Sequence, residues 1–543
     1  MSIFSIGLTG LNAARSALYT TSNNISNVYT PGYNRELVIL GEKQPGQGVS
    51  VDDVQRQFDQ YVADQLNTAN SKTSALQTYQ TQISQIDNLL ADQDAGLAPL
   101  MQKFFSSISD LAGAPSDPAA RQGVIGSADT LSAQFRSFDH YLTDMASGLD
   151  GQLHDEVTQI NNNAQQIASL NKQISLAKAR QGEAPNSLLN QRDKLVADLN
   201  KRLDVRVSVQ DGGSYNISIG NGQPLVSGER AFQLQTLSSA EDPSRTVIGY
   251  HDSAGNLVEL PDNTFSGGSL GGLLTFRDET LIPTRNQIGL LAASFASAIN
   301  EVHEQGTDLN GDPGKALFAI GQPLAYANAN NSGGASIPQG SVKFDDANID
   351  QLTGSDYDLR FDAASNEFQI TRKDTGETIT ATLDTNNQLH FGGVVVTVSD
   401  PTALADGDRF QVQPTRAAAA GFKNQRQDAS EIAAGLSDSS GDNSNALALE
   451  ALQKESLVSG SATFNQAYAS LVGEVGNRTN IVQVNLDAQQ GLSDQLTAVQ
   501  QSQSGVNLDE EAANLIRYQQ YYQANAKVIQ TGMTVLDTLL SLR

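Results

Sequence analysis

Residues 508–540, LDEEAANLIRYQQYYQANAKVIQTGMTVLDTLL, carry the pattern that decides the fold of this chain. Apolar residues recur every seven positions there, which predicts one long helix of about 50 Å with two apolar rows. The residues expected to contact other helices are Leu508, Leu515, Tyr522, Ile529 and Leu536 in one row, with Met533 and Leu540 in the other. Further apolar residues lie outside both rows, so the helix needs more than one partner. We expect the N-terminal helix and neighbouring copies of the chain to cover it.

The N-terminal segment 3–28 repeats the heptad pattern and is the expected partner of this last helix. Asparagines crowd the helix end. The next four residues predict a type II turn, because proline fixes φ and glycine accepts a positive φ. A short strand is expected over 35–40. The contact residues expected on the helix are Phe4, Leu8, Leu11, Leu18 and Ile25, and the residues of the turn motif are Asn23, Asn24, Asn27, Thr30, Pro31, Gly32 and Tyr33.

Helical periodicity returns in several interior segments. Apolar residues alternating three and four apart predict long helices over 58–90 and about 149–179. A helical pattern also covers 273–303 and the chain from about 445 to its end. If the segments between them are excursions, these helices can share one bundle, with the first and last helices side by side.

Two stretches between the helices have the period of two that is typical of strands. They cover about 203–261 and 314–414, and an Asp-Gly-Gly turn in the first predicts a hairpin. The glycines of 267–272 predict a flexible break. The expected fold class is mainly α with inserted β domains (α+β), a long-helix coiled-coil bundle built from both chain ends with two outer β-rich domains.

This order predicts four domains. They are a terminal coiled-coil domain of residues 1–57 and 500–543, a helical bundle domain of residues 58–202, 268–313 and 415–499, a β-rich insertion of residues 203–267, and an outer β-rich domain of residues 314–414.

Composition narrows the function classes. The formal charge is −26, and no run of basic residues occurs, which argues against a nucleic-acid ligand. The absence of cysteine excludes disulfides, thiolate metal sites and cysteine nucleophiles. No apolar stretch reaches the length of a membrane span, and the N-terminus lacks the basic stretch of a cleavable signal peptide.

Motifs for catalysis or metal binding are weak. Ser269 lies in a G-x-S-x-G match to the nucleophile elbow, but no strand is expected before it. Asp308, Asn310 and Asp312 alternate like calcium ligands, yet the remaining positions of a calcium loop do not follow, and a polar turn is expected. We therefore expect no catalytic residues, no cofactor and no metal. A secreted hydrolase using Ser269, or a glycan-binding protein using residues 314–414, is the alternative from another class.

Both chain ends resemble the flagellar axial protein family. Residues 8–14 (LTGLNAA), 23–27 (NNISN) and 30–33 (TPGY) resemble its N-terminal signature, and residues 510–527 resemble its C-terminal helix. The interior segments 271–278 and 298–303 resemble an interior helix of a junction protein in this family. The β region 314–414 shows no resemblance that we can assign.

The resemblance implies a structural, non-enzymatic adaptor of the bacterial flagellum that joins hook to filament. It implies copies assembled in a ring, contacting the hook protein and a second hook-associated junction protein, with terminal helices inside and β domains outside. It also implies extracellular localisation, export without a cleaved signal peptide, and an export chaperone bound to about 508–540. Another axial protein, either the hook protein or the second junction protein, is the nearest alternative.

Overall fold

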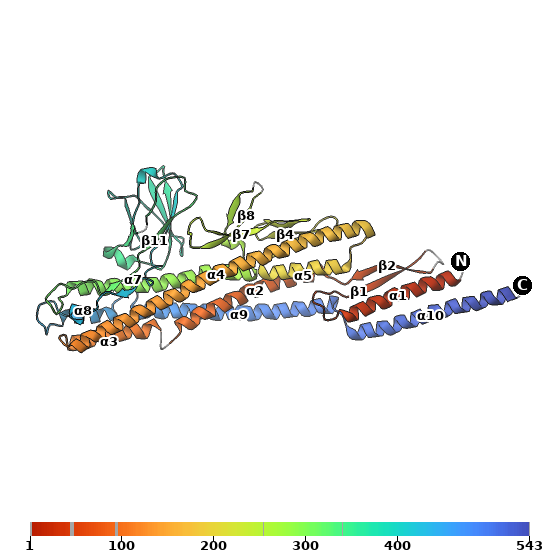
Figure 1. Ribbon diagram of the computed structural model, residues 1–543, viewed down its shortest axis with the longest axis horizontal. Coiled ribbons are helices and arrows are strands. Elements are labelled where there is room, and N and C mark those ends of the chain that lie inside the picture. The colour runs from red at the N-terminus through yellow and green to blue at the C-terminus, as the bar shows by residue number, and fades with distance from the viewer. Residues whose placement is uncertain (1–2, 44–47, 93–95, 253–254, 339, 542–543) are drawn as a thin grey trace.

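The computed structural model describes residues 3–43, 48–92, 96–252, 255–338 and 340–541. Long helices form an elongated rod, both termini lie at one end, and two β-rich regions stand on one side (Figure 1). The expected α+β class, with long helices and inserted β regions, is confirmed. Within the described residues, no helix is both long and apolar enough to cross a bilayer.

The two ends of the chain meet in space. Helix α1 (Ile3–Ser26) packs along α10 (Leu508–Ser541), as predicted, and the two run antiparallel. Strand β1 (Glu36–Glu42) forms a hairpin with β2 (Val49–Arg56), and both strands pack on α1. The sequence predicts β1 but not β2, because two adjacent aspartates interrupt the alternation of β2 and its register shifts at a bulge.

The rod is built mainly from helices before, between and after the β regions. Its longest helix, α4, has 64 residues and begins at Pro118, about thirty residues before the predicted start. Asp117 accepts the N–H of Ala119, and Pro118 occupies the first turn, so this pair starts the helix independently of the apolar row. The rod helices are α2 (Gln60–Leu90), α3 (Leu97–Gly113), α4 (Pro118–Gln181), α5 (Asn186–Arg202), α6 (Gly268–Phe276), α7 (Ile282–Gln305), α8 (Ser444–Ala451) and α9 (Phe464–Ser504).

The predicted flexible break at 267–272 is wrong. These glycines begin α6, which is buried against α2. A Cβ added to Gly272 would lie 2.4 Å from the carbonyl oxygen of Ala75, so the two backbones meet too closely for any side chain. A π-helical turn, Arg277–Leu281, then joins α6 to α7, so the chain is helical from Gly268 to Gln305 and this stretch contains the helix predicted over 273–303.

The first β region packs on α4 through a polar side chain. Asn171 of α4 is buried and exchanges hydrogen bonds with the backbone N–H and C=O of Tyr215, at 3.1 and 2.8 Å. The predicted hairpin is β3–β4, and the region contains two antiparallel sheets of order β3-β4-β5-β6 and β7-β8-β9. Its strands are β3 (Val205–Val209), β4 (Tyr215–Ile219), β5 (Pro224–Ser227), β6 (Arg230–Ala231), β7 (Leu234–Ser238), β8 (Thr246–His251) and β9 (Leu257–Leu260).

The outer β region packs a five-stranded sheet of order β11-β18-β13-β14-β15 and a three-stranded sheet of order β12-β17-β16. Alternate residues of β13 and β14 point into its core, which gives the period of two. A short pair, β10 (Phe318–Ala319) with β19 (Lys423–Asn424), lies near its base. The other strands are β11 (Leu324–Ala327), β12 (Val342–Phe344), β13 (Tyr357–Asp362), β14 (Glu367–Arg372), β15 (Thr378–Ala381), β16 (Gln388–Phe391), β17 (Val394–Thr397) and β18 (Arg409–Gln413).

Aromatic side chains close the rod core at the end far from the termini. Phe104, Phe295 and Phe318 are fully buried, and their ring centroids lie 5.5 to 5.8 Å apart. Phe422 and Phe464 extend the cluster to the segments that follow the outer β region. Such edge-to-face packing contributes about 0.5–1.5 kcal/mol per pair beyond burial. The rod therefore has a closed core of its own within one copy of the chain.

Candidate functional site: the terminal helices and their joint to the rod

Small residues form the contact between α1 and α10. A Cβ added to Gly10 would lie 2.2 Å from Oδ1 of Asn525, and one added to Gly532 would lie 2.6 Å from Cγ2 of Ile3. The helices therefore approach at backbone distance along this seam. The buried residues of α1 are Gly7, Gly10, Ala13, Ala14, Ala17, Thr20, Thr21 and Asn24. Ile3 and Phe4 reach Gly532 of α10, and the large apolar residues of α1 are otherwise half-buried or exposed.

The residues predicted to contact other helices are exposed or partly exposed. On α1, Leu8 is 55% exposed, while Phe4, Leu11, Leu18 and Ile25 are half-buried. On α10, Leu515 and Ile529 are half-buried, and Ile529 packs against Gly7. The other predicted α10 residues are exposed, namely Leu508, Tyr522, Met533, Leu536 and Leu540. One copy of the chain thus leaves an apolar face on both terminal helices.

The exposed apolar surface extends beyond the predicted residues. On α1 it includes Ile6 and Tyr19, and Tyr19 is 76% exposed. On α9 it includes Ile481, Val484 and Leu492. These residues are not among the predicted contacts, although the spacing of three between Ile481 and Val484 places those two on one helix face and is a signal that indicates them.

The predicted turn follows α1. The N–H of Tyr33 donates to the carbonyl of Thr30 at 3.1 Å, and Gly32 has φ of +81°, as a type II turn requires. Asn27 supports the turn, because its carbonyl accepts the N–H of Thr30 at 2.9 Å and its Oδ1 accepts the Thr30 hydroxyl at 3.0 Å. Pro31 occupies the remaining central position. The turn reverses the chain directly after α1.

Asparagine side chains hold the turn against the strand that follows it. Asn24 is 1% exposed, and its Nδ2 donates to the carbonyl of Glu36 at 2.9 Å while its Oδ1 accepts the Glu36 N–H at 3.0 Å. The same Oδ1 accepts the Tyr33 hydroxyl at 2.8 Å, and Asn23 Nδ2 donates to that hydroxyl at 3.3 Å. Burial and the carboxylates of Glu36 and Glu511 raise the pKa of Tyr33, so the phenol stays a donor. The turn geometry is therefore fixed by paired polar groups.

An arginine next to the turn ties it to the start of α10. Arg35 Nη1 lies 2.7 Å from Oε2 of Glu510, and its Nε lies 2.7 Å from Oε1 of Glu511, which is 1% exposed. The backbone N–H of Arg35 also donates to the carbonyl of Ser504, the last residue of α9. No sequence pattern indicates Arg35, because its partners on α10 lie some 475 residues away. We call this ion-pair cluster, together with the turn, the joint.

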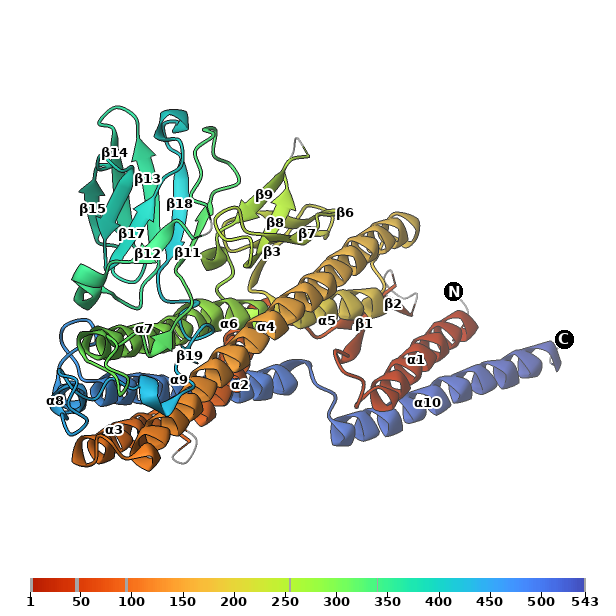
Figure 2. The ribbon, with the colours of Figure 1, turned by 60° about the vertical axis from the view of Figure 1, so that its left-hand side comes forward.

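A polar groove of about 940 Å³ opens at the joint. Its lining includes Pro31 and Gly32 of the turn, Lys194 of α5, and Gly505 between α9 and α10. The joint is thus the place where α1, α10 and the rod are held relative to one another (Figure 2).

The sequence motifs considered for catalysis and for metal binding form ordinary helix and turn structure. A 3-10 helix, Asp262–Thr264, precedes Ser269 in place of the strand that a nucleophile elbow needs. Oδ1 of Asp308 accepts the backbone N–H groups of Asn310 and Asp312 at 2.8 and 3.0 Å, which makes a polar turn. In the described ranges, no group of three His, Cys, Asp or Glu side chains is arranged to hold a metal ion.

Known protein families match most of the chain. A model described as the flagellar hook-associated protein FlgK helical domain matches residues 83–318, and one described as the flagellar hook-associated protein 1, D2-like domain matches residues 326–414. The second match covers the β region for which the residues showed no resemblance. Models of the flagella basal body rod protein and of the flagellar basal body rod FlgEFG protein C-terminal match residues 4–34 and 500–542.

Full-length relatives and a solved structure show the same similarity. The flagellar hook-associated protein 1 of Salmonella typhimurium is 42% identical over 559 residues, and that of Escherichia coli is 42% identical over 554 residues; each alignment covers 100% of both chains. The structure of the flagellar hook junction protein FlgK from Burkholderia pseudomallei has a TM-score of 0.74 and 30% identity, and covers 81% of this chain and 100% of that one. The similarity therefore includes the rod and the outer β region as well as the chain ends.

Proposed function

This chain belongs to the family of flagellar hook-associated protein 1 and is a structural component of the hook–filament junction, and we propose that its terminal helices carry the assembly. Neighbouring copies bury the outward faces of α1 and α10 against one another, and the helices form an inner coiled-coil layer. The family name favours this role over that of the hook protein or the second junction protein.

The exposed apolar face of α10 is the observation that carries the proposal. Met533, Val535, Leu536, Leu539 and Leu540 are 48 to 63% exposed in one copy. Burying the exposed half of each side chain would contribute about 1 kcal/mol, or about 5 kcal/mol per copy before ordering costs. In a monomer this apolar face contributes no packing energy, because the contact between small residues already holds α1 on α10.

The position of the β regions supports a ring with these regions outside. Both stand on the side of the rod away from α9 and α10 (Figure 2). A ring that gathers α1 and α10 at its centre therefore places the β regions at its periphery. The joint would then set the angle between the inner helices and the rod.

The remaining partners follow from the same surface. We propose that the hook protein and the second hook-associated junction protein contact the two ends of the ring, and that a flagellar export chaperone covers residues 508–540 before assembly. Export would proceed through the flagellar secretion apparatus without a cleaved signal peptide. An exposed apolar helix needs such a cover, because large exposed apolar faces promote aggregation.

Charge substitutions on α10 test the assembly proposal. Leu536→Glu with Leu540→Glu should leave the circular dichroism of the monomer unchanged, because both residues are exposed, but should abolish complementation of a strain that lacks this protein. That strain is expected to shed filaments and keep intact hooks. Gln530→Glu is the matched control, since it adds one charge at an exposed position of the same helix and should complement. Attached filaments in the double variant would contradict the proposal.

Hydrogen exchange on the free monomer provides a second test. Residues 508–540 should exchange faster than α2 and α9, and should become protected on assembly. Strong protection of these residues in a dilute monomer would show that α10 needs no neighbouring copy.

A further inference from the structure

A buried cluster of charged side chains lies where the outer β region, the first β region and the rod meet. Arg416, which follows β18, is 9% exposed, and Asp356, which precedes β13, is 6% exposed. Asp242, from the loop between β7 and β8, is 2% exposed. One guanidinium therefore faces two carboxylates away from bulk solvent, and the three residues come from distant parts of the chain.

Each nitrogen of the Arg416 guanidinium contacts a different part of the structure: the outer β region, helix α7 of the rod, or the first β region. Its Nη2 donates to Asp356 in the outer β region, its Nε donates to Oδ1 of Asn286 in α7 at 3.2 Å, and its Nη1 lies 3.5 Å from Oδ2 of Asp242. The carboxylates have further donors. Asn286 Nδ2 donates to Asp356 Oδ1 at 3.0 Å, and Gln413 Nε2 donates to Asp242 Oδ2 at 2.7 Å.

The surroundings of the cluster are polar and partly open. A cleft of about 680 Å³ lies beside it, between Glu279 and Arg478 of the rod side and Lys373 of the outer β region. Outside the cluster, hydrogen bonds between units include the N–H of Ala329 donating to the carbonyl of Ala240 at 2.8 Å. Buried apolar residues of the rod and of the outer β region belong to one cluster, so these polar contacts add to apolar packing where the two regions meet.

Loss of one charge from this buried cluster would destabilise the contact between the outer β region, the first β region and the rod. Removing one partner of a buried ion pair leaves an uncompensated charge, which is far more costly than losing an exposed pair. Arginine alone offers a planar fork with five donors, so lysine cannot reproduce three directed contacts. Without the guanidinium, Asp242 and Asp356 would lose their nearest cation and repel each other, with only the more distant Arg285 and Lys373 to offset their charge. Separation of the first and outer β regions would relieve that repulsion.

We propose that Arg416 fixes the orientation of the outer β region relative to the rod, and we call this residue with its three contacts the latch. Loss of its charge frees that region to swing about the two segments that join it to the rod, residues 320–324 and 413–417, while each unit stays folded. This role of Arg416 does not involve the terminal helices and does not rest on the assembly proposed above.

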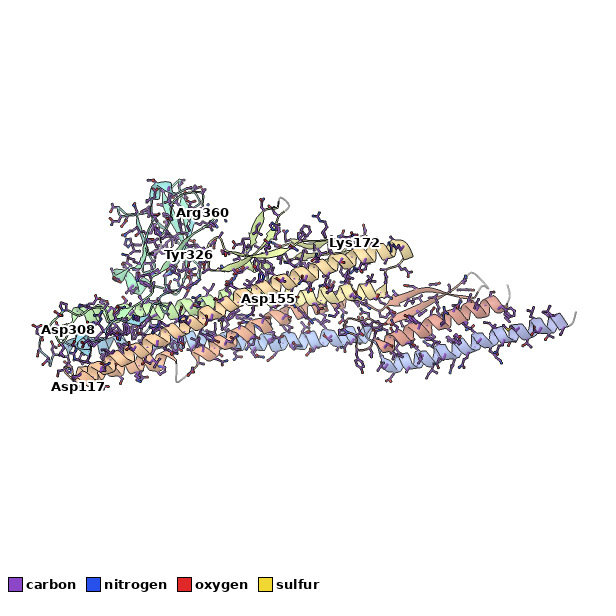
Figure 3. All side chains as sticks on the ribbon, viewed as in Figure 1. Asp117, Asp155, Lys172, Asp308, Tyr326 and Arg360 are labelled. Carbon is purple, nitrogen blue, oxygen red and sulfur yellow. The ribbon has the colours of Figure 1, made fainter. Side chains whose placement is uncertain are left out.

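Pairs of spin labels test the latch directly, because the chain has no cysteine of its own. Asp155→Cys on α4 and Arg360→Cys on β13 place exposed labels on the rod and on the outer β region (Figure 3). The distance distribution between them should be narrow, and Arg416→Met should broaden it. Lys343→Met, which removes an exposed charge from β12 of the same region, is the matched control and should leave the distribution narrow.

Hydrogen exchange gives an independent measurement of the same motion. The amide of Ala329, which bridges the two β regions, should exchange roughly 100-fold faster in Arg416→Met. Amides inside β13 and β14 should keep their protection. An unchanged label distribution together with unchanged exchange at Ala329 would overturn the proposal. If Arg416→Met fails to fold, Asp356→Asn decides the question by the same two outcomes, since it removes the carboxylate charge through which Arg416 holds the outer β region.

Discussion

Histidine 303 should make the far end of the rod sensitive to acid. It is fully buried near the C-terminal end of α7 and holds two loops at once. Its Nε2 accepts the backbone N–H of Ala433 at 3.0 Å, so its Nδ1 carries the hydrogen and donates to the carbonyl of Lys315 at 2.6 Å. Protonation of Nε2 would replace an acceptor with a donor that faces another donor.

The size of the effect follows from the pKa. Burial is the main cause that lowers the pKa of His303 from its ordinary value near 6.5 to about 4. Because the folded state prefers the neutral imidazole, its contribution to stability is complete above pH 6.5 and is lost as the pH falls through 4. The full contribution is about 3 kcal/mol, and about 2 kcal/mol of it is already lost at pH 5.

Local hydrogen exchange is the suitable assay, because a chain with several units need not unfold in one step. The opening free energy measured at the Ala433 amide should fall by about 2 kcal/mol between pH 7 and pH 5, after correction for intrinsic exchange. His303→Gln should abolish this pH difference. His154→Gln, which removes an exposed imidazole from α4, is the control and should retain it. An Ala433 amide equally protected at both pH values would refute the reasoning.

Three further substitutions test the packing and the joint. Gly272→Ala should lower the stability of the rod by about 2 kcal/mol, because the new Cβ would meet the backbone of α2; an unchanged urea midpoint would contradict this. Gly32→Val should cost about 1–2 kcal/mol at a φ of +81° and reduce filament attachment with the β regions still folded, and normal junctions would count against the turn. Arg35→Gln should leave the buried Glu511 unpaired and speed amide exchange in the first turns of α10 on the order of 100-fold, whereas unaltered exchange would show that the ion pairs do not hold the joint.

Local sequence patterns predicted those helices, strands and turns whose conformation depends on neighbouring residues in the chain. The heptad rows placed the start of α10 at Leu508, and the period of two with its glycine turn placed the hairpin β3–β4. Proline followed by glycine predicted the turn after α1. The prediction failed for α4, because the Asp117–Pro118 cap begins that helix about thirty residues before the apolar row used to find it.

The residues that connect the terminal helices and the outer β region to the rod could be identified only from the tertiary structure. Arg35 and Arg416 are single charged residues in unremarkable surroundings, and their partners lie about 475 and 60 or more residues away. No spacing rule links such residues, because an ion pair depends only on distance in space. The exposed residues on α9 could have been found from their spacing, but their exposure could not.

By itself, the sequence determined the types of the main elements, the apolar rows on the two terminal helices and the family to which both ends are similar. Periodicity and turn chemistry act over a few residues, so they can be read along the chain. Only the tertiary structure decided that α1 meets α10 at Gly7, Gly10 and Gly532 and leaves most of its large apolar residues partly or fully exposed. Which face of a helix is buried depends on how closely another backbone approaches, and that distance is set by the whole fold.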